Sequence, residues 1–312
     1  MAEELRIFSG NTHPDLAHAV CHYLGTPPGL IDVSQFSNEN IFVRILENVR
    51  GRDVFLLQPI STPVNRSLME LLIMIDAAKR ASAERITAVI PHYGYARTDK
   101  KDQPRVPVTA RLVADLITVA GASRVLTLDL HAGQIQGFFN IPVDELTALY
   151  LLCEYFEKKQ LENAVVVATD VGISKRARDM AERLKCPLAI IEKRRIDNND
   201  HAETQHVIGD VKDRNAILFD DEIDTAGSIT SAASALMQYG ATEVYACCTH
   251  PILSGPAIDR ISKSPLKEVV VTDSVPIPDA KREKLIVLSL APVIGEAIHR
   301  IHANLSIGAM FH

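Results

Sequence analysis

Short apolar runs recur along the chain, and each is followed by small or charged residues and then by an amphipathic segment. An uninterrupted apolar run indicates a strand that is buried on both faces, and apolar residues spaced three or four apart indicate a helix. Strands that alternate with helices in this way predict an α/β protein with mostly parallel sheets flanked by helices. The clearest predicted strands are residues 53–59, 86–91, 125–130, 164–168, 188–191, 216–219 and 243–248.

The order of strand, polar turn and helix occurs in residues 1–146 and begins afresh in residues 147–312. We therefore expect two similarly built domains with these ranges, although direct residue identity between the two halves is weak. A chain of 312 residues is long enough to form both hydrophobic cores. The amphipathic segment 293–305 is predicted to be the last helix, and residues 41–46 a strand of a hairpin.

Composition narrows the classes of function before any motif is considered. The net charge of −6 argues against a general nucleic-acid partner, and no apolar run approaches the roughly 20 residues that span a bilayer. The first ten residues, MAEELRIFSG, lack the features of a signal peptide. The five cysteines form no CxxC pattern, so we expect free thiols, no zinc site and a cytoplasmic protein without a membrane partner.

The segment AILFDDEIDTAGSIT, residues 216–230, places acids and a small-residue turn between a predicted strand and a predicted helix. Unpaired N–H groups at a helix N-terminus bind phosphate well. Acids beside such a turn would repel the phosphate itself, so they suit ribose hydroxyls or a hydrated Mg²⁺ ion. The simpler alternative is a solvated acidic strand end with a good N-cap. The residues concerned are Asp220, Asp221, Asp224, Thr225, Ala226, Gly227 and Ser228.

Further polar residues follow predicted strands in both halves, where open α/β sheets bind their ligands. His131 is either a ligand or a hydrogen-bonded structural residue, and Asp170 is either a ligand or a helix N-cap. Lys193 and Arg195 belong either to a solvated basic run or to a site for a polyphosphate, beside a polar loop that we expect to move. Arg97 follows the strand at residues 86–91.

In combination, these motifs resemble the ribose-phosphate pyrophosphokinase family, the phosphoribosyl-diphosphate (PRPP) synthases, over nearly the full length. The acid pair with its phosphate loop is shared with phosphoribosyltransferases, whereas YGYAR at residues 93–97 and LDLHA at 128–132 are more specific. Other matching segments are Asn11 with Pro14, VN at 64–65, MELL at 69–72, QIQGFF at 134–139, KRR at 193–195, THP at 249–251 and SGP at 254–256.

The resemblance implies two phosphoribosyltransferase-like domains and the reaction of ATP with ribose 5-phosphate to give PRPP and AMP, with Mg²⁺ required. It also implies assembly through dimers, commonly into a homo-hexamer, with ADP inhibition and phosphate activation. The basic segment 100–105 and the tail 306–311 resemble elements at the regulatory surfaces between subunits.

Matched by motif, the resemblance assigns Lys193 and Arg195 to catalysis and His131 and Asp170 to positions associated with the metal. Ribose 5-phosphate binding falls to Asp220, Asp221 and the loop of Asp224, Thr225, Ala226, Gly227 and Ser228. ATP binding falls to Phe36, Asn38, Glu39, Asn40, Arg97 and Thr98.

The chain departs from the family pattern at a few positions, two of them on the nucleotide side. Asn40 stands where the family has an acid, and Thr98 stands where Gln is usual. Residues 170–173 lack a second glycine, and Ser228 replaces a usual Thr while keeping the hydroxyl. These departures leave three alternatives to an active synthase: a non-catalytic regulatory homologue, a phosphoribosyltransferase, and a nucleotide-sensing module without turnover.

Overall fold

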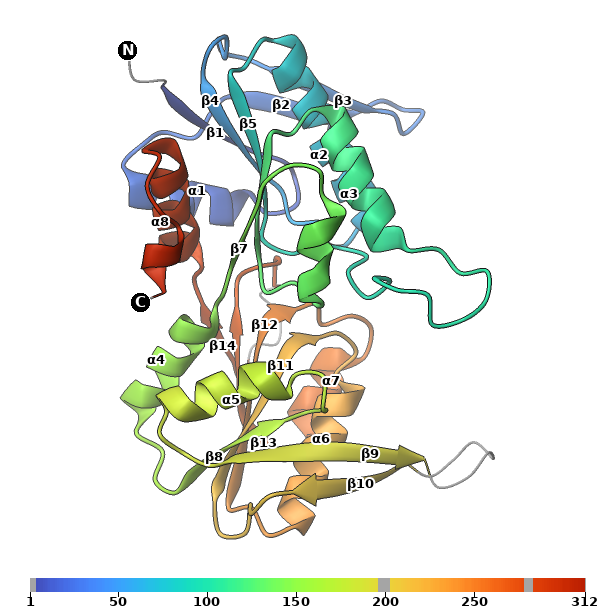
Figure 1. Ribbon diagram of the computed structural model, residues 1–312, viewed down its shortest axis with the longest axis vertical. Helices are drawn as coiled ribbons and strands as arrows, with labels where there is room; N and C mark the ends of the chain where they lie inside the picture. Colours follow the sequence, from blue (N-terminus) through green and yellow to red (C-terminus); the bar gives the residue numbers. More distant parts are fainter. Residues whose placement is uncertain (1–3, 196–202, 278–282, 312) are drawn as a thin grey trace. The chain divides into compact units, whose positions relative to one another are not determined.

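The computed structural model describes residues 4–195, 203–277 and 283–311 of the chain. It divides into two compact units (Figure 1). Unit 1 comprises Met1–Thr147, Ser274–Pro276 and Ser289–His312, and unit 2 comprises Ala148–Asp273 and Ile277–Leu288. Within the described residues, no helix has both the length and the apolar character needed to cross a membrane.

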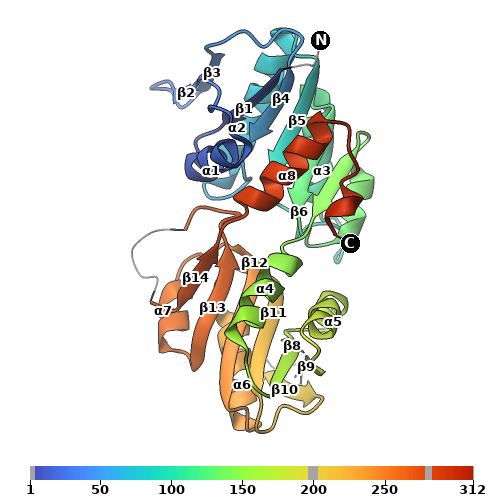
Figure 2. The same ribbon diagram turned by 90° about the vertical axis from the view of Figure 1, so that its left-hand side faces the viewer.

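Unit 1 is built on a five-stranded sheet in which all neighbouring strands are parallel, in the order β1-β4-β5-β6-β7. Helices α1 (Pro14–Leu24) and α8 (Ala291–His302) cover one face, and α2 (Val64–Arg80) and α3 (Thr109–Ala120) cover the other (Figures 1 and 2). The strands are β1 (Leu5–Ser9), β4 (Asp53–Leu57), β5 (Arg85–Ile90), β6 (Arg124–Leu128) and β7 (Val143–Leu146).

Burial on both faces explains why the inner strands of unit 1 are apolar without interruption. All five residues of β4 are buried: Val54 and Leu56 pack in the core shared with α2 and α3, and Phe55 and Leu57 alternate with them and point to the other face. Helix α2 supplies Leu71, Met74 and Ile75 to the same core, at helical spacing. The result is a two-faced core that holds the carboxyl ends of the strands in fixed positions.

A separate hairpin of β2 (Ile31–Gln35) and β3 (Ile41–Ile45) packs on α2. Its two strands pair only with each other, and they alternate between partly buried and exposed residues. The partly buried side chains, among them Val33 and Val43, contact the core of unit 1.

Unit 2 is built on a seven-stranded sheet in the order β10-β9-β8-β11-β12-β13-β14, in which only the β9–β10 pair is antiparallel. Helices α4 (Leu149–Lys159) and α5 (Ser174–Arg183) pack on one face, and α6 (Gly227–Gln238) and α7 (Ala257–Lys263) on the other. The strands are β8 (Ala164–Ala168), β9 (Leu188–Arg195), β10 (Glu203–Ile208), β11 (Asn215–Ile223), β12 (Glu243–Pro251), β13 (Leu266–Thr272) and β14 (Leu285–Leu288). The predicted fold class, with mostly parallel sheets flanked by helices, is confirmed.

The end of the chain differs from the predicted domain ranges, which placed it in the second domain. Helix α8 packs against α1, so residues 289–312 belong to unit 1. The buried stripe of α8 includes Ile294, Ile298 and Ile301. An amphipathic pattern shows that a helix covers an apolar face, but it does not show which sheet provides that face.

Two strand ends also differ from the prediction. β9 continues through residues 192–195, beyond the predicted strand 188–191, and β10 begins at Glu203, inside residues 196–206, which the sequence predicts to be a polar loop. The antiparallel ladder between them satisfies the backbone groups of an edge whose sequence is too polar to signal a strand.

Candidate functional site

The hairpin of unit 1 presents four of the proposed nucleotide-binding residues at its exposed turn, namely Phe36, Asn38, Glu39 and Asn40. The Phe36 N–H donates to the Asn40 carbonyl (2.8 Å), and the Asn40 N–H donates to Asn38 Oδ1 (3.2 Å). The ring of Phe36 is 56% exposed and contacts the ring of Phe42 at a centroid distance of 5.6 Å. The turn is therefore ordered by its own contacts, with an apolar surface and amide groups facing outward.

Arg97 and Thr98 lie in the loop that follows β5, and both are exposed. The Thr98 hydroxyl and N–H both donate to the Tyr95 carbonyl, at 2.9 and 3.1 Å. The Tyr95 hydroxyl in turn donates to Asn65 Oδ1 at the start of α2. This loop passes close to the end of β4, because a Cβ added at Gly94 would lie 2.6 Å from the Ile60 carbonyl oxygen.

His131 lies shortly after β6 and is exposed. The carboxylate of Glu145 on β7 fixes its loop by accepting from the Leu130 N–H (2.9 Å) and from Gln136 Nε2. Gln134 Nε2 donates to the buried Asp99 carboxylate, which belongs to the Arg97 loop. The loops that carry Arg97 and His131 are therefore tied together within unit 1.

The sequence predicts that Asp220 and Asp221 follow the strand 216–219. In the structure of unit 2 they lie within β11, which continues to Ile223. The pairing of β11 with β8 stops at Phe219, whereas its pairing with β12 continues to Ile223. The acids therefore occupy the part of the strand that has lost one neighbour, at the carboxyl edge of the sheet. This is the edge where open α/β sheets bind ligands.

The Asp220 carboxyl group is held by the Thr169 hydroxyl (2.7 Å to Oδ2) and the Asp221 N–H (2.9 Å to Oδ1). Burial, together with the neighbouring carboxyl group of Asp221, raises the pKa of Asp220 to about 8. The pair therefore shares a proton near neutral pH, and a hydroxyl-bearing or cationic ligand would favour its release.

The turn of Asp224, Thr225, Ala226, Gly227 and Ser228 leads directly into α6, as predicted. Ala226 has a left-handed backbone (φ 59°), which turns the chain sharply from β11 into the helix. Three neighbours brace the turn. The Ser254 hydroxyl donates to Asp224 Oδ1, Arg260 Nη1 donates to the Thr225 carbonyl (3.0 Å), and the Thr230 hydroxyl donates to the Ala226 carbonyl (2.7 Å).

The spacing of apolar residues predicts that the buried face of α6 consists of Ile229, Ala232, Ala233, Leu236 and Met237. The first four are buried, whereas Met237 is 41% exposed, so the prediction was wrong for that residue. The N-terminal N–H groups of α6 point toward the turn, in the arrangement that favours an anion.

Asp170 follows β8, is exposed, and accepts the Ile173 N–H at 3.1 Å through Oδ1. Its carboxylate thus supports the turn that precedes α5. The N-cap of α5 is Ile173 and has no side-chain hydrogen bond, so the N-cap interpretation of Asp170 was wrong. Lys193 and Arg195 belong to β9 by their backbone, opposite Gln205 and Glu203 of β10. Their side chains lie outside the described residues, as do residues 196–202 between the two strands.

A metal ion bound to either of the predicted metal residues would need further oxygen donors from substrate and solvent. In the described part of the chain, no three or more His, Cys, Asp or Glu residues gather as a metal site. Asp170 offers an exposed carboxylate and His131 an exposed ring. Each is a single donor in its own unit, and a single carboxylate suits Mg²⁺, which keeps several waters and binds through one or two carboxylates and substrate phosphates.

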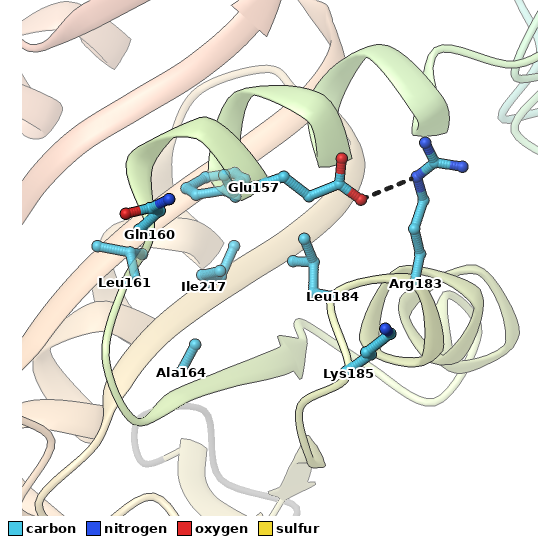
Figure 3. Close-up of a pocket in the computed structure, with 9 residues that line it drawn as sticks. Glu157, Gln160, Leu161, Ala164, Arg183, Leu184, Lys185 and Ile217 are labelled. Atoms are coloured by element: carbon cyan, nitrogen blue, oxygen red, sulfur yellow. Dashed lines mark ion pairs between the residues drawn. The ribbon is translucent and has the colours of Figure 1, made fainter.

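Unit 2 contains a cavity of about 380 Å³ (Figure 3). It is lined by Phe156 and Glu157 of α4, Arg183 at the end of α5, and Ile217 near the amino end of β11. Glu157 Oε1 and Arg183 Nε form an ion pair (3.3 Å) at its rim. None of the predicted site residues lines it.

Two family models match the chain. One, described as the N-terminal domain of ribose phosphate pyrophosphokinase, covers residues 5–121, and the phosphoribosyl synthetase-associated domain covers residues 201–312. The ribose-phosphate pyrophosphokinase of Oceanobacillus iheyensis is 54% identical over 98% of this chain and 97% of that protein. The corresponding protein of Caldanaerobacter subterraneus is 55% identical over 98% of both. The chain belongs to the ribose-phosphate pyrophosphokinase family.

A solved structure from the same family agrees with this fold. The crystal structure of phosphoribosylpyrophosphate synthetase from Mycobacterium smegmatis matches with a TM-score of 0.92 and 44% identity. The match covers 97% of this chain and 100% of the other. The resemblance found in the motifs is therefore confirmed over the full length, and the fold is that of the pyrophosphokinase family.

Sequence reasoning missed several residues that support the site of this family member. Thr169, Ser254 and Arg260 hold the acid pair and the phosphate loop from neighbouring elements. Ser254 lies in the SGP segment that resembles the family, which was a usable signal, although no role followed from it. Arg260 on α7 had no signal, because its contact joins residues 35 positions apart in the sequence.

Proposed function

We propose that this chain is a ribose-phosphate diphosphokinase that transfers the β,γ-diphosphoryl group of ATP to the anomeric hydroxyl of ribose 5-phosphate, giving PRPP and AMP. One observation carries the proposal. The chain has an acid pair on β11 followed by a braced phosphate turn at the start of α6. It also resembles ribose-phosphate pyrophosphokinases over nearly its whole length.

The sugar phosphate is assigned to unit 2. The backbone N–H groups of the turn from Asp224 to Ser228 hold the 5-phosphate at the positive end of α6. The carboxylates of Asp220 and Asp221 accept hydrogen bonds from the ribose hydroxyls, which fixes the sugar ring and the direction of its anomeric hydroxyl. Binding the hydroxyls draws the shared proton off the acid pair, because both carboxyl groups then act as acceptors.

The nucleotide is assigned to residues of unit 1. The exposed Phe36 ring offers a stacking surface for the base, and Asn38, Glu39 and Asn40 offer groups for its edge. Arg97 and Thr98 contact the phosphates or ribose of ATP. Asn40 both donates and accepts where a carboxylate would only accept, so the base edge is read differently from the family pattern.

Transfer needs cationic groups next to the diphosphoryl group, because negative charge develops as its bond to AMP breaks. Lys193 and Arg195 provide this charge, since the guanidinium binds two phosphate oxygens at once and the ammonium binds one. Mg²⁺ supplies further charge on the phosphate oxygens when bound, and His131 and Asp170 are the residues that would hold it. Positioning and charge stabilisation then account for most of the rate.

The test is the release of AMP from ATP in the presence of ribose 5-phosphate and Mg²⁺. The wild type is expected to form AMP and PRPP in equal amounts, and Lys193→Ala to lose several orders of magnitude in kcat with substrate binding largely kept. Lys212→Ala, an exposed lysine of the same unit, is the matched control. Near-wild-type turnover in Lys193→Ala would remove that residue from the mechanism.

The same assay separates the alternatives. A regulatory homologue or a nucleotide-sensing module forms no AMP, whereas a phosphoribosyltransferase consumes PRPP when a nucleobase is added. Neither outcome is expected, because the chain keeps both the cationic pair and the acidic loop.

We further propose a cytoplasmic homo-oligomer, a hexamer built from dimers, whose activity ADP inhibits and phosphate raises. The exposed basic segment 100–105 and the tail 306–311 both belong to unit 1 and are the surfaces we assign to this control. Sedimentation of the protein with and without phosphate measures the assembly, and AMP formation with added ADP measures the control.

A further inference from the structure

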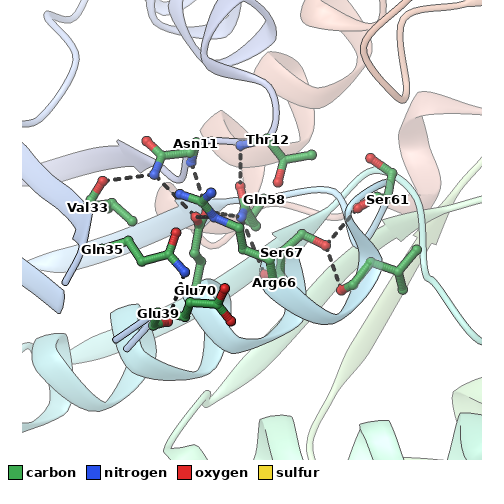
Figure 4. Close-up of polar contacts among 11 residues, drawn as sticks. Asn11, Thr12, Val33, Gln35, Glu39, Gln58, Ser61, Arg66, Ser67 and Glu70 are labelled. Carbon is green, nitrogen blue, oxygen red and sulfur yellow. Dashed lines mark hydrogen bonds and ion pairs between the residues drawn. The ribbon is translucent and has the colours of Figure 1, made fainter. Parts of the chain in front are cut away.

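Glu70 on α2 carries a buried carboxylate that faces four hydrogen-bond donors (Figure 4). Its side chain is 2% exposed. Oε2 accepts from Gln58 Nε2 (2.8 Å) and from the Asn11 N–H (3.2 Å), and Oε1 accepts from Arg66 Nε (3.0 Å) and Asn11 Nδ2 (3.2 Å). Burying a carboxylate costs free energy unless it is paired and hydrogen-bonded, and this carboxylate is both.

The donors come from three different parts of unit 1. Gln58 follows β4, is fully buried, and also accepts the Thr12 N–H (3.2 Å) through Oε1. Gly10 lets the loop after β1 approach this amide, since a Cβ there would lie 2.3 Å from Gln58 Oε1. The Glu70 carboxylate therefore fixes the loop after β1, and Asn11 with it, against α2.

Asn11 is the link from this carboxylate to the hairpin. Its Nδ2 donates both to Glu70 Oε1 (3.2 Å) and to the Val33 carbonyl of β2 (2.8 Å). Figure 4 shows Asn11 between Val33 and Glu70. The backbone of β2 is thus held by a side chain that Glu70 itself orients.

The two strands of the hairpin extend no larger sheet, and their partly buried side chains pack on α2 and the core of unit 1. A two-stranded hairpin is at best marginally stable by itself in water, so its direction depends on this packing and on the hydrogen bond from Asn11 to Val33. Within the turn, Gln35 Nε2 donates to the Glu39 carbonyl (2.9 Å), which orders the tip but does not direct it.

We propose that Glu70 is a positioning residue for nucleotide binding: it fixes Asn11, Asn11 fixes β2 at Val33, and the turn of Phe36 to Asn40 is thereby aimed at the base. This inference rests on the proposed nucleotide role of the turn. Glu70 touches no substrate in this scheme, so its removal changes the binding of one substrate and not the chemical step.

The experiment compares Glu70→Gln and Asn11→Ala with the wild type in the full-length protein. In Glu70→Gln an NH₂ group replaces one carboxylate oxygen. This group faces hydrogen-bond donors and cannot accept from them, so the variant no longer holds Asn11 in place. We expect KM for ATP to rise about tenfold in Glu70→Gln, because the loss of one charge-assisted hydrogen bond corresponds to a change of that size. We expect kcat and KM for ribose 5-phosphate to change less than about twofold. Asn11→Ala is expected to act in the same direction, and the double variant to be no worse than Glu70→Gln.

Ser123→Ala is the matched control. The Ser123 hydroxyl bridges the N–H and carbonyl of Ile86 (both 3.0 Å) in the same unit and does not contact the hairpin. Its KM for ATP is expected to stay at the wild-type value.

A second measurement needs no turnover. Amide hydrogen exchange in residues 31–45 is expected to quicken about tenfold in Glu70→Gln and in Asn11→Ala, with β4 and β5 unchanged, as local opening predicts. Unchanged exchange and unchanged KM for ATP would overturn the inference, as would equal rises in both KM values. If Glu70→Gln does not fold, Asn11→Ala decides. A wild type that forms no AMP refutes the proposed function alone, and exchange then still decides the positioning.

Discussion

The Asp220 carboxyl group holds its proton more tightly in the folded chain than in the unfolded one. Burial and Asp221 raise its pKa to about 8, against about 4 for an unfolded aspartate. Between these values the folded state binds more protons than the unfolded state, so stability falls as the pH rises. Asp220 therefore costs stability at the pH where the enzyme would use its carboxylate.

We predict that Asp220→Asn raises the free energy of unfolding of the ligand-free protein at pH 8 and leaves it nearly unchanged at pH 4. The amide carries no charge, and it can still accept from Thr169. Denaturant unfolding from pH 5 to 8 should show a smaller fall in the variant than in the wild type. Glu162→Gln, which alters an exposed carboxylate of the same unit, serves as control. A variant less stable than the wild type at pH 8 would show that the carboxyl group is charged there without penalty.

Asn40 allows a prediction about the choice of nucleotide. Its amide can donate to the O6 acceptor of guanine as well as accept from the amino group of adenine. We expect Asn40→Asp to lower kcat/KM for GTP about tenfold relative to ATP, since the carboxylate then faces an acceptor. Parallel AMP and GMP release assays measure this ratio. Equal changes with both nucleotides would place Asn40 away from the base edge.

At the scale of elements, an ion pair with a buried carboxylate attaches the end of α8 to the sheet of unit 1. Asp53 at the start of β4 is fully buried, and its Oδ2 accepts from Arg85 Nη2 and lies 2.8 Å from His302 Nδ1. Arg85 Nη1 also donates to Asn304 Oδ1 (3.1 Å). The tail is therefore attached by charge as well as by its apolar stripe.

We predict that Asp53→Asn destabilises the protein by about 3 kcal/mol, because the ion pair of its fully buried carboxylate with Arg85 is then lost. Asp76→Asn is the matched control, since Asp76 pairs with Arg80 in an exposed i,i+4 position on α2. It is expected to change little. Denaturant unfolding of both variants tests the difference, and similar losses would mean that burial adds nothing to the Asp53 pair.

The elements that could be predicted are those whose burial produces an apolar run within a short window of sequence. β4, β5, β8, β11 and β12 are apolar on both faces, so their runs stand out. β7 (VDEL) and β10 (ETQHVI) lie at sheet edges, where polar residues are tolerated, and no run marked them. Their positions depend on ladders to strands that the local pattern does not describe.

The candidate site divides in the same way. The acid pair and the phosphate turn could be predicted, because strand, turn and helix N-terminus are adjacent in the sequence. The Glu70 carboxylate could not, since its partners Asn11 and Gln58 are 59 and 12 positions away. A motif can contain such a residue, as MELL contains Glu70, without showing what it contacts.

At the scale of the whole molecule, the chain returns at its end to the unit in which it began. Unit 2 has its own cores on both faces of its sheet, formed by residues between 148 and 288. Only residues 274–276 of that span group with unit 1. The boundary that the sequence predicts near residue 147 marks where unit 2 starts. No change of composition marks the end of unit 2 at residue 288.

We predict that the fragment 148–288 folds alone and binds ribose 5-phosphate, because β11, α6 and the supporting Ser254 and Arg260 all lie within it. It is expected to form no AMP, since the proposed nucleotide residues are absent. Calorimetric titration measures binding, with ribose as the control ligand that lacks the phosphate. Binding of ribose 5-phosphate but not ribose would place the phosphate at the turn before α6. A folded fragment that binds both equally would assign the affinity to the acid pair instead, and one that binds neither would refute the assignment of the sugar to unit 2.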